Sequence, residues 1–200
     1  MNIIITGGNS DIAKHLANKL KNGKNKILLP LKTELDVTDE NSVENYFKSN
    51  CADLVINCAG TLYSSTIINS SPDMWIRDIN VNLIGTYLVC RMALIQNPEC
   101  RIINISSTAA FNAYNDWSSY CASKAGVLKI SKALYLDNFN VITMCPGAID
   151  TKIRNNLNIQ NPNVMDLDEG ITPILDAIDN KYPNGSIVFY RKNEFKVLID

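Results

Sequence analysis

The chain has 200 residues, of which 46% are hydrophobic and 20% are charged, and its formal net charge is −1. This length and composition are typical of one globular domain with a full hydrophobic core, so we expect a single domain over residues 1–200. The 19 Lys and Arg residues form no basic block, and sequence-independent nucleic-acid binding needs a concentrated positive face. We therefore expect no nucleic-acid partner.

Apolar runs of strand length alternate with helical patterns along the chain. Strands are expected at Asn2–Thr6, Lys26–Leu29, Glu34–Val37, Leu54–Asn57, Arg101–Ser106, Val141–Met144 and Ser186–Tyr190. Helices are expected at Ile12–Asn22, Asn41–Ser49, Pro72–Ile95, Ser118–Leu136 and Leu167–Lys181. Repeated strand–helix–strand units require right-handed crossovers, so this order predicts an α/β fold: a doubly wound parallel sheet of about seven strands with helices on both faces.

The first expected strand lacks the basic and long apolar regions of a signal peptide. The most apolar helical stretch contains Asn80, Asn82 and Arg91, which would be costly in lipid, so a buried core helix is expected. The six cysteines include no CxxC pair, and His15 has no Cys or carboxylate cluster around it. We expect a cytoplasmic protein with reduced thiols, no membrane partner and no metal site.

Tyr120 and Lys124 are four residues apart in an expected helix, so their side chains share one helix face. An unperturbed phenol titrates near pH ~10, and an ammonium group beside it in a partly dry pocket favours its ionised form. Ser107, at the end of the preceding strand, can hold a substrate oxygen while the phenol exchanges a proton with it. The same spacing also occurs in exposed helices without function. Whether Tyr120 and Lys124 are catalytic therefore depends on the other motifs of the chain.

A glycine turn, Thr6-Gly-Gly-Asn-Ser-Asp-Ile-Ala13, lies between the first expected strand and the first expected helix. Such a turn lets backbone N–H groups approach a pyrophosphate, and the helix N-terminus favours negative charge. Only Gly7 keeps a spacing typical of nucleotide-binding turns. Asp11 can cap the helix through its side chain, and it also adds a negative charge beside a phosphate.

The second expected strand is followed by Lys32 and Thr33, and no carboxylate occurs before Glu34. Dinucleotide folds that use NAD usually place an acidic residue here for the adenosine ribose, whereas a lysine and a hydroxyl suit a 2′-phosphate. We therefore expect NADP(H) as the preferred cofactor and NAD(H) as the alternative. Lys32 can also be read as a solvated turn lysine.

The chain resembles the short-chain dehydrogenase/reductase family, in its simple, non-extended branch, through motifs that occur in family order. These are Thr6-Gly7, Asp36-Val37, Asn57-Cys-Ala-Gly60, Asn80-Val-Asn82-Leu-Ile-Gly85, Asn104-Ile-Ser-Ser107, Tyr120 with Lys124, and Pro146-Gly147-Ala-Ile-Asp-Thr151. Ser107 and Tyr120 are thirteen residues apart, the separation usual in the family. The incomplete glycine turn and short loops after the second and sixth strands depart from the family pattern.

The resemblance implies a Rossmann-type fold and an NAD(P)-dependent oxidoreductase that interconverts a ketone or aldehyde and an alcohol. Tyr120 would be the general acid or base, and Lys124 would lower its pKa and hold the nicotinamide ribose. Ser107 would orient the substrate oxygen, and Asn82 would support a water chain from Lys124 to solvent. Two of these assignments have alternatives: Ser106 can replace Ser107, and Asn82 can simply bond backbone within its own helix.

The cofactor contacts are expected along the whole series of motifs. They are Thr6, Gly7, Asn9, Ser10, Ile12, Lys32, Asp36, Val37, Asn57, Ala59, Gly60, Tyr120, Lys124, Pro146, Ile149 and Thr151. The Asn-rich stretch at residues 147–166 is either a solvated loop or a lid over a polar substrate, because ligands bind at the carboxyl edge of open α/β sheets. Tyr114 and Trp117 are either walls of the substrate space or ordinary core aromatics.

We expect NADPH-dependent reduction of a small, polar carbonyl compound, with the reverse alcohol oxidation possible in principle. Two other functions remain open: a catalytically weak, nucleotide-sensing or regulatory protein of the same fold, and an epimerase or dehydratase with a regenerated cofactor. The presence of both Tyr120 and Lys124 disfavours the first, and the lack of an extra substrate domain disfavours the second. A homodimer or homotetramer is expected, formed through the helices that carry Asn82 and Tyr120.

Overall fold

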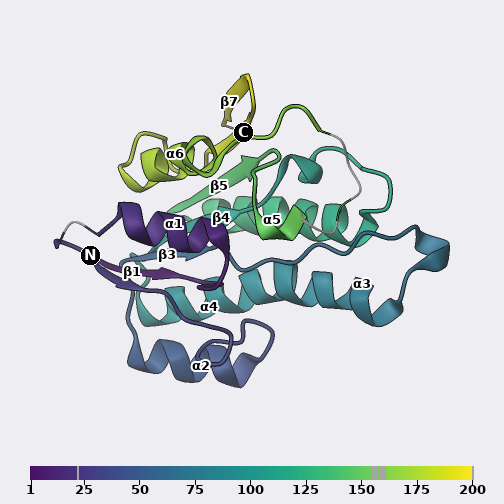
Figure 1. Ribbon diagram of the computed structural model, residues 1–200. Helices are drawn as coiled ribbons and strands as arrows, with labels where there is room; N and C mark the ends of the chain where they lie inside the picture. Colours follow the sequence, from purple (N-terminus) through teal and green to yellow (C-terminus); the bar gives the residue numbers. More distant parts are fainter. Residues whose placement is uncertain (22, 155–156, 158–160, 200) are drawn as a thin grey trace.

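A seven-stranded sheet lies at the centre of the computed structural model, which describes residues 1–21, 23–154, 157 and 161–199 (Figure 1). The strand order is β2-β1-β3-β4-β5-β6-β7. The first six strands of this order pair in parallel, and β7 pairs antiparallel to β6. The strands are β1 (Asn2–Ile5), β2 (Lys26–Leu28), β3 (Leu54–Asn57), β4 (Arg101–Ile105), β5 (Val141–Pro146), β6 (Ile187–Arg191) and β7 (Glu194–Leu198).

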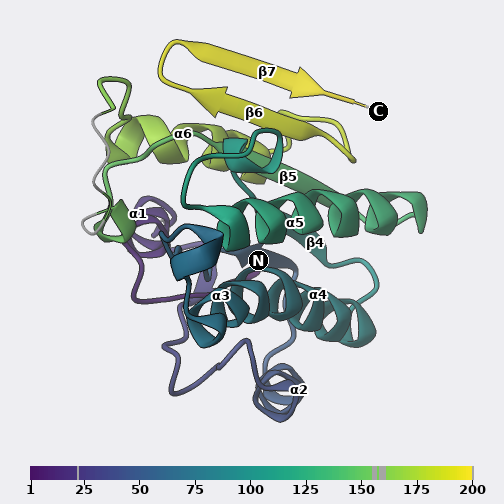
Figure 2. The ribbon, with the colours of Figure 1, turned by 90° about the vertical axis from the view of Figure 1, so that its right-hand side faces the viewer.

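Helices cover both faces of the sheet, which confirms the predicted doubly wound α/β fold (Figure 2). Ile3 and Ile5 pack with α1 and α6 on one face, and Ile4 packs with α2 and α4 on the other. This alternation follows from the two-residue period of a strand, and it explains why buried strands are apolar throughout. The helices are α1 (Asp11–Lys19), α2 (Glu40–Ser49), α3 (Pro72–Ile79), α4 (Gly85–Gln96), α5 (Ser118–Leu136) and α6 (Leu167–Ile178).

The strand predicted at Glu34–Val37 is wrong, because this segment forms turns. The Glu34 carboxylate accepts the N–H of Leu31 at 2.8 Å, and the Asp36 carboxylate accepts the N–H of Thr38 at 3.0 Å. Such local side-chain bonds to the backbone compete with strand pairing. The resulting turns place Asp36 and Val37 beside the carboxyl end of the sheet instead of inside it.

Strand β7 was not predicted, although the total of seven strands was. The chain reverses at Lys192 and Asn193, where Asn193 has a φ of 65°. Asparagine tolerates this left-handed conformation better than most residues, so Asn193 is the signal that could have revealed the hairpin. The hairpin brings Arg191 and Glu194 to the edge of the sheet where the predicted site lies.

The helix predicted at Pro72–Ile95 is divided by a π-helical turn at Asn80–Ile84. Such turns insert one residue into a helix and often occur at functional sites. The stretch Pro72–Gln96 is long and apolar enough to cross a membrane, but 56% of its most apolar window is buried inside the protein. This burial agrees with the core helix expected from the sequence.

The ends of two other helices differ from the prediction. Helix α1 ends at Lys19, and the predicted end at Asn22 lies outside the described residues. Helix α6 ends at Ile178 instead of Lys181, and it begins with a capping box between Asp166 and Glu169. The bounds of α5, which carries Tyr120 and Lys124, are as predicted.

Candidate active site

A cavity of about 760 Å³ opens at the carboxyl ends of β1, β3, β4 and β5. Parallel strands of this topology place their ligand sites at this edge. The structure brings most of the predicted site residues to its wall. They are Gly7, Asn9, Ser10, Ile12, Lys32, Asp36, Val37, Ala59, Gly60, Ser107, Tyr120, Lys124, Pro146, Ile149 and Thr151.

The glycine turn is built for close backbone approach. Gly7 has a φ of 69°, a left-handed conformation that favours glycine. A Cβ on Gly8 would lie 2.4 Å from the carbonyl oxygen of Leu29, so the second strand's end packs directly against this turn. The sequence reading gave a role only to Gly7, and it missed the requirement for glycine at position 8.

Helix α1 begins directly after this turn, and its cap is Ser10. The Ser10 hydroxyl accepts the N–H of Ala13 at 3.2 Å. Asp11 does not cap the helix, so the capping role expected for it is wrong. Its carboxylate instead accepts the N–H of Lys152 at 2.7 Å, from the loop that follows β5.

Thr6 and Asn57 are not among the residues that line the cavity, and their cofactor contacts, through backbone or side chain, stay a prediction. The Thr6 hydroxyl accepts the N–H groups of Cys58 and Ala59, both at 3.1 Å. The Asn57 amide donates to the Asn104 side chain at 2.8 Å, inside the sheet. Both residues are buried, and they shape the loop after β3.

Lys32 and Asp36 lie together at the far end of the cavity from Tyr120. Their charged groups are 3.4 Å apart, and the Lys32 side chain is 81% exposed. Burial tends to raise the pKa of Asp36, but hydrogen bonds from Thr38 and the charge of Lys32 lower it below its usual range. A cation and an anion are therefore both available to an adenosine ribose or its phosphate.

Ser107 and Tyr120 both line the cavity wall. The Ser107 side chain lowers the pKa of the Tyr120 phenol against the effect of burial, and the Ser107 hydroxyl accepts the N–H of Ala109 at 3.1 Å. The neighbouring hydroxyl of Ser106 donates to the carbonyl of Lys124 at 2.8 Å and is committed to helix α5. These contacts favour Ser107 over Ser106 as the residue that faces a substrate oxygen.

Lys124 is 5% exposed, and its ammonium group donates to the carbonyl of Ile105 at 2.8 Å. The ammonium nitrogen lies 5.7 Å from the centre of the Tyr120 ring. Burial lowers the pKa of Lys124 to about 8, and burial raises the pKa of Tyr120 to about 12, against the opposing effect of Ser107. The structure thus differs from the expected lowering of the phenol pKa by Lys124, because desolvation dominates at both groups.

Asn82 lies in the π-helical turn and is fully buried behind the cavity wall. Its side chain forms a two-way pair with Thr61, accepting the Thr61 N–H at 2.8 Å and donating to the Thr61 carbonyl at 2.9 Å. It also donates to the hydroxyl of Ser123, on helix α5, at 3.0 Å. The side chain therefore joins two segments of the site instead of bonding backbone within its own helix.

Gly60 leaves a space between Asn82 and Lys124. A Cβ at this position would lie 3.4 Å from the Asn82 Oδ1 and 3.7 Å from the Lys124 Nζ. The predicted water chain would pass through this region. The water chain itself stays a prediction.

Asp78 is a buried carboxylate that sequence reasoning missed. It accepts hydrogen bonds from the Thr61 hydroxyl at 2.7 Å, the Tyr63 N–H at 2.7 Å and the Ser119 hydroxyl at 2.9 Å, and it pairs with Arg77 at 3.1 Å. Asp78 thus ties the loop after β3 to the residue before Tyr120. A charged residue on the apolar side of an expected core helix was the available signal.

Tyr114 and Trp117 both line the cavity, and neither is a core residue. Trp117 contacts both tyrosines: its ring centre is 5.3 Å from that of Tyr114 and 5.9 Å from that of Tyr120, edge to face. The aromatic row supports their reading as walls of the substrate space. Of the Asn-rich stretch, residues 155–156 and 158–160 lie outside the described part, while Arg154, Leu157 and Asn161 line the cavity.

No group of three or more His, Cys, Asp or Glu side chains that could hold a metal ion occurs among the described residues. The glycine turn and the capped N-terminus of α1, both on the wall of the cavity of about 760 Å³, fit a dinucleotide. Ser107, Tyr120 and Lys124 lie at one end of that cavity and the Lys32–Asp36 pair at the other. The arrangement is suited to proton transfer beside a bound nicotinamide.

Known proteins show the same pattern in sequence. A family model described as short chain dehydrogenase matches residues 1–162. An uncharacterized oxidoreductase of Staphylococcus aureus (strain MRSA252) is 29% identical over 163 residues, which cover 76% of this chain and 68% of that protein. An uncharacterized oxidoreductase of Thermotoga maritima is 33% identical over 128 residues, which cover 58% of this chain and 50% of that protein.

Solved structures share the fold over nearly the whole chain. A small-chain dehydrogenase in complex with NADPH superimposes with a TM-score of 0.85, at 19% identity, covering 95% of this chain and 96% of that chain. A 4-hydroxyisoleucine dehydrogenase complexed with NADH superimposes with a TM-score of 0.79, at 22% identity, covering 93% and 94%. Together with the match over residues 1–162, this shows that the chain belongs to the short-chain dehydrogenase family and has its Rossmann-type fold.

Proposed function

We propose that the protein is an NAD(P)-dependent oxidoreductase that reduces a small carbonyl compound, with NADPH as the preferred cofactor. The observation that carries the proposal is that Ser107, Tyr120 and the buried Lys124 line the same cavity as the glycine turn, with the Lys124 ammonium nitrogen 5.7 Å from the centre of the Tyr120 ring. The family match and the relatives described as oxidoreductases support it.

The residues present fit a bound dinucleotide. Gly7, Gly8 and the N-terminus of α1 would receive the pyrophosphate, because the turn offers backbone N–H groups and the helix end favours an anion. Pro146, Ile149 and Thr151 would line the nicotinamide side. When bound, the nicotinamide supplies the hydride that the carbonyl carbon receives.

The protein's own residues supply the proton. With its pKa raised to about 12, Tyr120 is protonated at neutral pH, so it can donate a proton to the carbonyl oxygen as a general acid. Ser107 would hold that oxygen by a hydrogen bond and stabilise the negative charge that develops on it. Lys124 would hold the ribose hydroxyls, and reduction as the working direction follows from the proposed preference for NADPH.

The NADPH preference rests on Lys32. Its ammonium group is exposed on the cavity wall, where a 2′-phosphate could replace Asp36 as its partner. A relative in fold binds NADPH and another binds NADH, so affinity must be measured on this chain. We expect wild-type protein to bind NADPH at least about 10-fold more tightly than NADH, a charged hydrogen bond being worth about 1.5–3 kcal/mol. Lys32→Met should remove this difference, and Lys48→Met, on α2 away from the cavity, should retain it.

Self-association through helices α4 and α5 is part of the same proposal. Ile84, Tyr87 and Ile95 lie on the outer side of this helical region and are 41%, 46% and 56% exposed. A second copy of the chain would cover such residues. Sedimentation velocity would show a dimer or tetramer, and a monomer at micromolar concentration would contradict this part of the proposal.

Tyr120→Phe tests the reaction itself. The variant keeps the ring that packs on Trp117 but has no proton to donate, so turnover of a carbonyl panel with NADPH should fall by about 10²- to 10⁴-fold. Affinity for NADPH, followed by its fluorescence, should change less than threefold. Full turnover by the variant would refute the assigned chemistry. Tight NADPH binding by the wild type without any turnover would favour the nucleotide-sensing alternative.

A further inference from the structure

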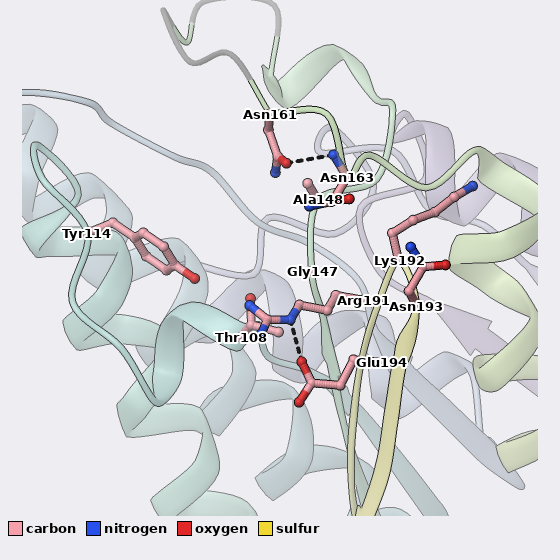
Figure 3. Close-up of a pocket in the computed structure, with 10 residues that line it drawn as sticks. All are labelled: Thr108, Tyr114, Gly147, Ala148, Asn161, Asn163, Arg191, Lys192, Asn193 and Glu194. Carbon is pink, nitrogen blue, oxygen red and sulfur yellow. Dashed lines mark hydrogen bonds and ion pairs between the residues drawn. The ribbon is translucent and has the colours of Figure 1, made fainter.

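A second cavity, of about 410 Å³, adjoins the first at the carboxyl end of β5 (Figure 3). Thr108, directly after Ser107, lines both cavities, as do Tyr114 and Gly147. A substrate whose oxygen is held at Ser107 and Tyr120 can therefore extend into the second cavity. Its outer wall is the tip of the β6–β7 hairpin, contributed by Arg191, Lys192, Asn193 and Glu194.

Arg191 is held in place by three contacts. Its Nε donates to the Glu194 carboxylate at 2.5 Å, and its guanidinium carbon lies 5.8 Å from the centre of the Phe189 ring. A Cβ on Gly147 would lie 2.5 Å from the Arg191 Cβ, so the arginine stem packs directly on the glycine backbone. Only glycine at position 147 allows the arginine this place.

The end of the guanidinium group faces the cavity. Figure 3 shows the Arg191 side chain reaching from the hairpin across the cavity toward the side of Thr108. The hydrogen bond to Glu194 uses Nε, which leaves the two terminal nitrogens of Arg191, a residue that lines the cavity, available to a ligand. A guanidinium fork of this kind matches the two oxygens of a carboxylate.

The charges around Arg191 are unbalanced within the hairpin. Glu194 also accepts from Lys196 at 2.6 Å, so one carboxylate serves two cations. The charges of Lys196 and Arg191 hold the pKa of Glu194 below its usual range. Lys192 has its own partner, Glu169, away from this cluster. An anion bound in the cavity would neutralise the excess positive charge of Arg191, Glu194 and Lys196, whereas a neutral polyol would leave that charge uncompensated.

We propose that the second cavity binds a carboxylate group of the substrate through the two terminal nitrogens of Arg191. The substrate would then be an oxo acid, reduced to the matching hydroxy acid. The inference rests on the proposed function and adds the substrate class to it. Around the carboxylate, the Tyr114 hydroxyl and the Asn161 and Asn163 side chains offer further polar groups.

Matched pairs of simple substrates test this proposal. The probes are 4-oxopentanoate and 5-oxohexanoate, each compared with its own methyl ester, in the presence of NADPH. Wild-type protein should show a higher kcat/KM for at least one acid than for its ester. Arg191→Met should lower kcat/KM for that acid by about 10- to 100-fold, the loss of a charged hydrogen-bonded pair, and change it for the ester less than threefold.

Two variants make the test specific. Lys181→Met removes a surface cation that pairs with Asp176, outside both cavities and outside the Arg191–Glu194–Lys196 cluster, and should keep the preference for the acid. Arg191→Lys keeps the charge without the fork and should fall between the wild type and Arg191→Met. Far-ultraviolet circular dichroism and NADPH affinity should be unchanged in all three, which shows that the hairpin and the nucleotide site are intact.

Binding is measured separately from turnover, so that the two proposals can fail independently. Trp117 lines the main cavity, and its fluorescence should respond when 4-oxopentanoate or 5-oxohexanoate is titrated into the protein with NADP⁺. Acid binding that is lost in Arg191→Met, without any turnover, would keep this subsite and refute the proposed reaction. Equal kcat/KM for acids and esters in the wild type, an acid preference that survives Arg191→Met, or no acid binding and no turnover would overturn the subsite.

Discussion

Asp11 and Lys152 join the two sides of the nucleotide cavity. The Asp11 carboxylate, in the first turn of α1, accepts the N–H of Lys152 at 2.7 Å and lies 3.6 Å from its ammonium group. Lys152 belongs to the loop after β5, which also supplies Ile149 and Thr151 to the wall. The Asp11 carboxylate therefore holds this loop against the glycine turn. It also adds a negative charge beside the expected phosphates.

Two variants of Asp11 separate these effects. Asp11→Asn keeps an oxygen that can accept the Lys152 N–H but removes the negative charge. Because the repulsion of the cofactor phosphates is lost, NADPH should bind about twofold to fivefold more tightly than to the wild type, the size of effect expected between charges near the surface. Asp11→Ala removes both and should bind NADPH less tightly than Asp11→Asn by about fivefold, the worth of one hydrogen bond. Fluorescence titration measures both values, and equal affinities of the two variants would show that the loop contact is immaterial.

The two neighbouring serines after β4 should have different roles. Ser107→Ala removes a donor aimed at the substrate oxygen, so kcat/KM should fall by about 10²- to 10³-fold with little change in stability. Ser106→Ala removes a hydrogen bond to the Lys124 carbonyl, which keeps its partner within helix α5, so the free energy of unfolding should fall by about 0.5–1.5 kcal/mol. Its activity at low temperature should stay within tenfold of the wild type. Urea unfolding and steady-state kinetics on both variants test these roles. A large loss of kcat/KM in Ser106→Ala together with little loss in Ser107→Ala would contradict the assignment.

Asp78 should be the most sensitive carboxylate for stability. Asp78→Asn replaces one carboxylate oxygen with an NH₂ group, which then faces either Thr61 and Arg77 or Tyr63 and Ser119, and it leaves Arg77 without its counter-charge. Breaking a buried pair of this kind costs about 3–5 kcal/mol, which urea unfolding would measure.

The matched control is Asp168→Asn. Asp168 pairs with His15 and Lys19 at the surface, with a side chain that is 64% exposed. Loss of such a pair should cost at most about 1 kcal/mol. Equal losses for the two aspartates would mean that the Asp78 network contributes no more than a surface pair.

The sequence predicted the sheet because buried parallel strands are apolar along their whole length, as in Ile3, Ile4 and Ile5. It failed where local hydrogen bonds decide the backbone, as at Asp36 and Thr38, and where an asparagine at positive φ starts a hairpin, as at Asn193. These effects depend on single side chains and leave no periodic pattern.

The same division applies to the site. Residues placed by a motif, such as Ser107 and Tyr120, could be predicted to share one cavity. Arg191 could not, because its position depends on the hairpin, a feature of the three-dimensional packing, whereas the charge of Asp78 within an apolar helical pattern was a signal that was missed. The sequence also predicted the wrong direction for the pKa shift of Tyr120. Burial is a property of the folded chain, and here its effect on the pKa outweighs that of the nearby Lys124.

Lys124 should make folding stability depend on pH. Its pKa is lowered by burial from 10.5 to about 8, so between these values the unfolded chain binds a proton that the folded chain has released. Below pH 8 both states are protonated and the buried charge costs the folded state about 3 kcal/mol. As pH rises from 8 to 10.5 this cost disappears, so the lysine favours folding more strongly at high pH.

Lys124→Met removes this titration while keeping a long apolar stem. Its free energy of unfolding should exceed that of the wild type at pH 7, by up to about 3 kcal/mol less the loss of the bond to Ile105, although the variant should have no activity. The difference should shrink by about 1.4 kcal/mol per pH unit above pH 8. Comparing the two proteins cancels the opposite contribution of buried thiols such as Cys145, whose pKa is raised to about 12. A difference that stays constant from pH 7 to 10 would show that Lys124 titrates alike in both states.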